Sequence, residues 1–168
     1  MKKIKFLIKL RKEEKLELVE PSEEIKESYI LKSRSNLVSS KILLENNKLE
    51  EAVALTYYSM YHIVTALFFK VGIKCENHAA TIILLKELLN IDNSDISSAK
   101  AERIDKQYYT NFHITKQEVI EAIKNAEIFN SKILDFISKV SNKDIKIYRE
   151  RFDELTSEEN RLEKKQTL

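Results

Sequence analysis

Residues 49–71 decide the fold, and they read LEEAVALTYYSMYHIVTALFFKV. Their large apolar side chains recur every three or four residues, which is the period of one face of an α-helix. That face comprises Val53, Tyr57, Met60, Val64, Leu67 and Val71. A parallel row of mostly small residues contains Ala52, Thr56, Ser59, Ile63 and Ala66. Two adjoining packing faces predict a central, well-buried helix, and Gly72 is suited to a left-handed cap at its end.

The segment before this helix has a helical pattern of its own. Ile30, Leu37 and Leu44 repeat every seven residues. Ser33 and Ser40 lie between them, and such small residues let a second helix approach closely. Pro21 is suited to the first turn of this helix, where its missing N–H is no loss.

Three further helical patterns follow the central segment. Asn77 is suited to cap a helix with a run of leucines and isoleucines. A weaker pattern covers about residues 95–109. The capping box Thr115-Lys-Gln-Glu118 then opens the clearest helix of the chain, which runs to about Val140.

The composition agrees with an all-α fold. The 168 residues include one glycine and one proline, whereas a sheet protein of this size needs many tight turns. Short polar connections between helices predict an up-and-down helical bundle of four to five helices. We divide the chain into a basic N-terminal extension of uncertain structure (1–20), the bundle (21–140) and a charged C-terminal helix or tail (141–168). Residues 1–15 contain seven Lys or Arg and two Glu, so this extension could contact phosphate.

Several classes of protein are excluded or disfavoured. The single cysteine, Cys75, cannot form an intrachain disulfide, and no apolar stretch approaches the roughly 20 residues of a membrane-spanning helix. One glycine rules out a phosphate loop and a dinucleotide fingerprint. We therefore expect a cytoplasmic protein with no membrane contact, no cofactor and no metal site.

The central helix also carries a family resemblance. The run EAVALTYYSMYH at residues 51–62 resembles the second helix of HEPN domains, which shows an alanine and then a Tyr-Tyr-small-Met-aromatic-His block. In that family a glycine follows, and then a histidine that opens a helix. Gly72 and His78 match both in order and in spacing.

A third feature of the family lies further along the chain. It is an arginine near the end of a later helix, followed by a loop, a capped entry and a long final helix. Arg103, the Tyr108-Tyr109 pair and Thr115 fit this order, so the resemblance spans residues 25–140.

The resemblance implies a helical bundle that pairs into a homodimer. Many members of the family accompany a minimal nucleotidyltransferase in a two-component, toxin–antitoxin-like system. Catalytically active members are metal-independent ribonucleases. Their hallmark is an arginine followed, after four to six residues, by a histidine.

This chain departs from that hallmark. Four residues separate Arg103 from Tyr108, which occupies the place of the histidine, and the next histidine is His113. Metal-free RNA cleavage needs proton-transfer groups that titrate near neutral pH, and a tyrosine with a pKa of about 10 does not. Arg103, Tyr108 and His113 are thus the candidate catalytic residues of a divergent ribonuclease.

The same residues admit other interpretations. Arg103 could instead bind phosphate, or it could pair with a carboxylate such as Glu102 or Asp105. Tyr58, His62, His78 and Tyr109 are the candidate binding residues. Tyrosines beside cations can stack nucleobases, but on an apolar helix face they also pack in a core or a dimer interface. His62 fits a hydrogen-bonded interior histidine, and His78 fits the start of a helix.

Three functions follow from the sequence. The first is a dimeric HEPN partner of a minimal nucleotidyltransferase, in an RNA- or nucleotide-related system, with Tyr108 as a hydroxyl that the enzyme could modify. The second is the divergent ribonuclease. The third is a purely structural dimer whose apolar stripe is an interaction surface.

Overall fold

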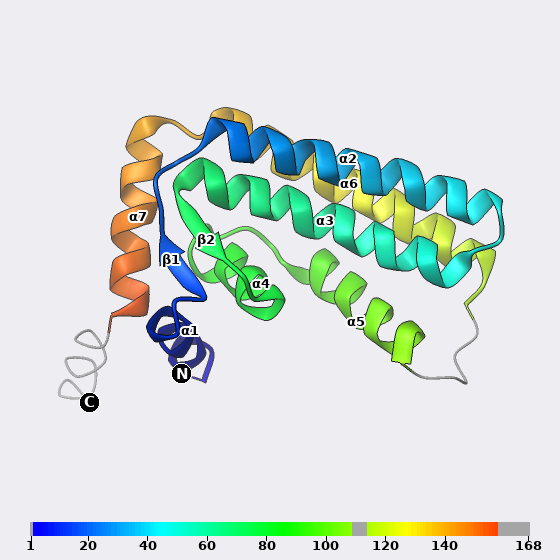
Figure 1. Cartoon of the computed structure of the whole chain (residues 1–168), viewed down its shortest axis with the longest axis horizontal. Helices are drawn as coiled ribbons and strands as arrows, with labels where there is room; N and C mark the ends of the chain where they lie inside the picture. Colours follow the sequence, from blue (N-terminus) through cyan, green and yellow to red (C-terminus); the bar gives the residue numbers. More distant parts are fainter. Residues whose placement is uncertain (1, 109–113, 158–168) are drawn as a thin grey trace.

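The computed structural model describes residues 2–108 and 114–157, with the backbone alone for residues 104–108. The elements follow the chain as α1 (Lys2–Lys12), β1 (Leu16–Leu18), α2 (Glu23–Glu45), α3 (Leu49–Val71), β2 (Ile73–Cys75), α4 (His78–Glu87), α5 (Ser94–Tyr108), α6 (Lys116–Lys139) and α7 (Asn142–Thr156). Figure 1 shows α2, α3 and α6 as long helices side by side, with α5 along α3 and with α1 and α7 at one end. The predicted all-α helical bundle is confirmed.

Helix α3 is the centre of the core, as its sequence predicts. It contacts α2, α5, α6 and α7. Every residue of its two predicted faces is buried, and Tyr57, Val64 and Leu67 are 0% exposed. Burying a large apolar side chain contributes roughly 1.5–3 kcal/mol, so this double face supplies much of the driving force for folding. By length and composition α3 could also span a membrane, but two thirds of that stretch is buried, as in a core helix.

Small polar residues join α2, α3 and α6. The Ser33 hydroxyl donates to the backbone oxygen of Ser59 at 2.8 Å, and the Asn130 amide donates to the Ser59 hydroxyl at 2.7 Å. Thr56 and Ser40 make a similar contact at 3.1 Å. All of these side chains are buried. The predicted close approach of a second helix along Ser33 and Ser40 is confirmed.

The ends of the helices follow the predicted caps, with one exception. The Asn77 side chain accepts the N–H groups of Ala79 and Ala80, and the Thr115–Glu118 capping box is present. At α2, however, the cap is Ser22, whose hydroxyl accepts the Ile25 N–H at 3.2 Å. Pro21 therefore precedes the cap, and the prediction that it occupies the first turn is wrong.

The two terminal segments contribute to the core. Leu7, Leu10 and Leu16 are buried in the same cluster as the residues of α3, and Phe152 of α7 is 0% exposed. Strand β1 pairs antiparallel with β2, with Leu16 opposite Cys75. The sequence placed these segments outside the bundle because the apolar spacing in 1–20 fitted a helix and a strand equally, and because residues 141–168 have few apolar side chains among many charged ones.

Candidate functional site

Arg103 lies on α5 against two aromatic rings of α3. Its guanidinium carbon is 4.7 Å from the ring centre of Tyr58 and 5.5 Å from that of Tyr57. These are cation–π distances. Its Nε atom is buried without an acceptor among the described residues. No described carboxylate forms an ion pair with this guanidinium, and the side chain of Glu102 is exposed. Among the side chains that the structure describes, Arg103 therefore has no counter-charge, and the side chain of Asp105 lies outside them.

His78 is the first residue of α4 and lies beside the same rings. Its Nδ1 is 2.7 Å from the hydroxyl of Tyr57. Its ring stacks on Tyr61, with ring centres 3.9 Å apart and an angle of 5° between the planes. The Asn77 cap fixes the backbone of this turn. These contacts hold the imidazole in one plane and one orientation.

His62 lies on α3, one helical turn after Tyr58. Its Nδ1 is 3.1 Å from the amide nitrogen of Asn36 on α2, and its ring stacks on Tyr58 at 6.0 Å. It also lies against the ring of Tyr29. The ammonium nitrogen of Lys32 is 4.8 Å from the centre of that Tyr29 ring. The predicted interior hydrogen bond of His62 is thus present.

We call Tyr57, Tyr58, Tyr61, His62, His78 and Arg103 the Arg103 cluster. Burial lowers the pKa of both histidines, and nearby cations lower it further: Arg103 and Lys100 for His78, and Lys32 for His62. Both rings are thus held neutral at neutral pH. Burial also raises the pKa of Tyr57 far above its usual range, so that its hydroxyl stays protonated.

The chemistry of this cluster is that of an anion site with aromatic walls. The charged groups that act on its histidines are cations. Hydrogen-bond donors and flat rings together suit a phosphate that carries a base. Within residues 2–108 and 114–157, no group of three His, Cys, Asp or Glu side chains is placed to hold a metal ion.

Four of the seven sequence-predicted site residues come together here: Arg103, Tyr58, His62 and His78. Tyr108 is the last residue of α5, and its side chain lies outside the described part of the chain. Tyr109 and His113 also lie outside the described residues.

Four further residues, from α2 and α5, complete the cluster and were not predicted from the sequence. They are Tyr29, Lys32, Asn36 and Lys100. The first three are spaced by three and four residues, so they share one helical face. That spacing indicates a shared face of α2 from the sequence alone. Only the packing of α2 on α3 shows that this face contacts His62.

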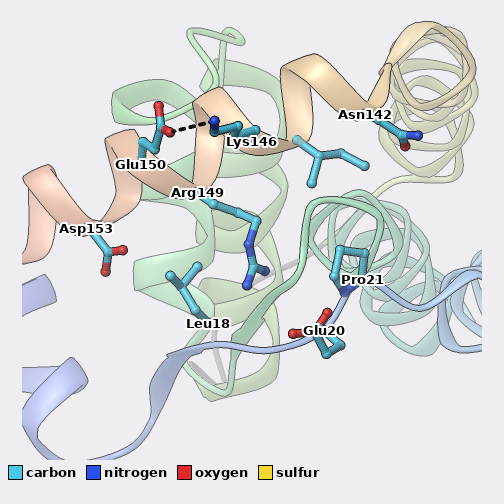
Figure 2. A pocket seen from close by; sticks show the side chains of 9 residues that line it. Leu18, Glu20, Pro21, Asn142, Lys146, Arg149, Glu150 and Asp153 are labelled. Carbon is cyan, nitrogen blue, oxygen red and sulfur yellow. Dashed lines mark ion pairs between the residues drawn. The ribbon is translucent and has the colours of Figure 1, made fainter.

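A separate open hollow of about 520 Å³ lies between α7 and the link from β1 to α2. Figure 2 shows Arg149 extending from α7 into it, between Leu18 and Pro21. Its guanidinium donates to the backbone oxygens of Val19 and Gly72, the latter at 2.9 Å. This arginine therefore binds the backbone at the C-terminal cap of α3. No sequence-predicted site residue lines the hollow.

Comparisons with known proteins agree with this fold. The model of the HEPN domain family matches residues 26–140. A UPF0332 protein of Pyrococcus horikoshii is 29% identical over 122 residues, which cover 73% of this chain and 82% of the relative. A candidate toxin of Methanocaldococcus jannaschii is 28% identical over 64% of this chain and 85% of its own length. A UPF0332 protein of Archaeoglobus fulgidus is 28% identical over 67% and 95%.

Proposed function

Because the chain belongs to the HEPN domain family, we propose that it is the HEPN component of a toxin–antitoxin-like system and binds RNA or a nucleotide through the Arg103 cluster. One observation carries the proposal. The guanidinium of Arg103 lies on the Tyr58 ring at 4.7 Å and has no carboxylate partner among the described residues. Arginine binds phosphate through paired N–H donors, and an aromatic ring beside it can stack a base.

Binding to a non-cleavable probe tests this site directly. The probe is a fluorescent 2′-fluoro oligoribonucleotide, and binding is followed by anisotropy at low salt. Charge-assisted hydrogen bonds contribute about 1.5–3 kcal/mol, so Arg103→Ala should weaken binding by about tenfold to a hundredfold. Lys139→Gln removes an exposed cation of α6 outside the cluster and serves as the control. Equal affinity of wild type and Arg103→Ala contradicts the proposal.

A metal-independent ribonuclease is the second candidate function. The Arg103 cluster holds two neutral histidines near the arginine of the family hallmark, which favours this alternative. The site would use Arg103 with Tyr108 and His113, completed across a dimer. An RNA cleavage assay with EDTA compares wild type with Arg103→Ala. Cleavage that disappears in the variant supports the enzyme, and equal cleavage by both removes it.

We also propose a homodimer that meets its partner copy through α2. Leu31, Val38 and Ile42 are 62%, 58% and 53% exposed and lie on one face of that helix. Grouped exposed apolar side chains of this kind mark interaction surfaces. This face is opposite the face of α2 that packs on α3, in which Ser33 and Ser40 are buried. This surface also accommodates the third candidate function, a purely structural dimer.

The partner of the dimer is proposed to be a minimal nucleotidyltransferase, which either modifies the chain or is held by it. Tyr108 supplies a hydroxyl for such a modification at the end of α5. Co-expression with a nucleotidyltransferase encoded nearby, followed by mass spectrometry of the intact protein, tests this. A nucleotide adduct that is absent from Tyr108→Phe supports modification. Co-purification without an adduct supports holding. If neither an adduct nor co-purification is observed, this partnership has no support.

A further inference from the structure

His78 shares both aromatic neighbours of Arg103. Its ring centre is 5.8 Å from that of Tyr57 and 6.1 Å from that of Tyr58. The Arg103 guanidinium lies 5.5 Å and 4.7 Å from the same two rings. The imidazole, from α4, and the guanidinium, from α5, therefore lie against the same two rings. One chain thus brings the two groups together.

The Tyr57 hydroxyl decides which nitrogen of His78 carries the proton. Tyr57 is 0% exposed, and Nδ1 of His78 is the one partner of its hydroxyl among the described residues. A buried phenol with a single partner donates its hydrogen to that partner, since the O–H would otherwise remain unsatisfied. Nδ1 is thus the acceptor, and the hydrogen of the neutral ring lies on Nε2.

Nε2 of His78 is the ring nitrogen that the Tyr57 hydroxyl leaves available for a ligand, as far as the described residues go. It makes no hydrogen bond to any described residue. It is also absent from the enclosed side-chain atoms without a partner, which in the described part of the chain are Nε of Arg103 and Oδ1 of Asn130. An atom that is neither bonded nor enclosed is reachable from solvent. His78 therefore presents an oriented N–H donor beside Arg103, whose guanidinium forms no ion pair with a described carboxylate.

We propose that His78 is a second phosphate-binding residue of this chain, with its Nε2–H donating to an oxygen of the phosphate that Arg103 holds. The proposal rests on the proposed function of the Arg103 cluster. The ligand is the phosphate of a nucleotide, whether a terminal monoester or an RNA diester. Because Nε2 carries a hydrogen in the neutral ring and in the imidazolium alike, His78 can donate to the phosphate in either protonation state.

The proposal implies that binding takes up a proton. Described titratable or charged groups that contact or act on His78 are Tyr57, Tyr58, Tyr61 and His62 of α3 and Lys100 and Arg103 of α5. Cys75 of β2 acts on Tyr61, and the nearby carboxylate of Glu76 pairs with Lys74 at 2.9 Å. The cations among them oppose an imidazolium in the free protein. A bound phosphate offsets that repulsion, so the pKa of His78 rises on binding and the affinity increases as the pH falls.

The test measures affinity against pH for wild type, His78→Gln and Arg103→Ala. The probes are the 2′-fluoro oligoribonucleotide and AMP, between about pH 5.5 and 7.5, the range that brackets an ordinary histidine pKa. We expect wild type to bind more tightly as the pH falls. His78→Gln should bind about threefold to tenfold more weakly at neutral pH, as for one lost hydrogen bond, and with a flatter pH profile. Binding of AMP identifies a monoester site, and binding of the oligonucleotide alone identifies a diester site.

The outcomes separate the two proposals. Probe binding that is lost in Arg103→Ala but keeps its affinity and its pH profile in His78→Gln overturns the role of His78 alone. No binding by wild type overturns both proposals. If His78→Gln does not fold, histidine NMR of the wild-type protein decides. A rise in the His78 pKa on addition of the probe supports the proposal, and an unchanged pKa overturns it.

Discussion

The hydroxyl of Tyr57 lies 2.7 Å from Nδ1 of His78, and this hydrogen bond joins the buried face of α3 to the first residue of α4. Tyr57 belongs to the core, since none of its surface is exposed. The same residue orients an imidazole of the candidate site. The site is therefore held by the core itself, and changes in its charges act on stability as well as on binding.

The charge of Arg103 should have a measurable effect on the pKa of His78. Burial is the largest cause of the lowered His78 pKa, and Arg103 and then Lys100 follow. Replacing Arg103 by Met removes a nearby cation, which makes the imidazolium less unfavourable. We expect Arg103→Met to raise the His78 pKa, and Lys100→Met to raise it less. NMR titration of the histidine side chains measures both. An unchanged His78 pKa in Arg103→Met would place the guanidinium away from this ring in solution.

Stability should fall as the pH falls below neutrality. The pKa values of His78 and His62 are lower in the folded chain than in the unfolded one. Between the folded and unfolded pKa values, the unfolded chain binds more protons. The free energy of unfolding therefore decreases as the pH falls from about 6.5, an ordinary histidine value, towards the folded pKa. Urea unfolding between about pH 5.5 and 7.5 measures the slope. His78→Gln and His62→Gln should each reduce it, and a slope equal to that of wild type in the double variant contradicts the assignment.

Gly72 should not tolerate a side chain. Its φ of 77° is left-handed, and an added Cβ would lie 2.5 Å from the backbone oxygen of Val19 and in contact with the guanidinium of Arg149. We expect Gly72→Ala to cost about 2 kcal/mol or more, from backbone strain and from lost hydrogen bonds of Arg149. Chemical denaturation measures it.

A double-variant cycle separates the two causes. In Arg149→Ala the contact with the guanidinium is already absent, so Gly72→Ala should cost less there than in wild type. Asn47 also has a positive φ, of 57°, and Asn47→Gly should leave stability unchanged or slightly higher. Equal costs of Gly72→Ala in both backgrounds would attribute the whole effect to backbone strain and to the contact with the Val19 oxygen.

The proposed dimer should depend on α2. Val38→Glu places a charge in the exposed apolar face of α2, and we expect the protein to become monomeric without loss of helicity. Ile147→Glu is the matched control, because Ile147 is similarly exposed, at 46%, but lies on α7. Light scattering after size exclusion measures the mass of each. A Val38→Glu protein that remains a dimer assigns the interface to another surface.

The site was predictable as a set of residues but not as an arrangement. The sequence singled out Arg103, Tyr58, His62 and His78, and the structure places them in one cluster. Neither the Tyr57–His78 hydrogen bond nor the lack of an ion pair between Arg103 and any described carboxylate follows from spacing. Glu102 adjoins Arg103 in the chain, yet adjacent residues of a helix do not face each other.

Sequence patterns alone predicted the helices of the bundle, α2 to α6, and the buried face of α3, but not α1. Helical periodicity and caps are local properties, and they specify which side of each helix is apolar whatever it packs against. The tertiary structure decided what the polar sides meet. It brought Asn36 to His62 and His78 to Tyr57, and it enclosed Leu7 and Phe152 in the core. These contacts join residues distant in the chain, so no local pattern encodes them, and they determine the charge and the shape of the candidate site.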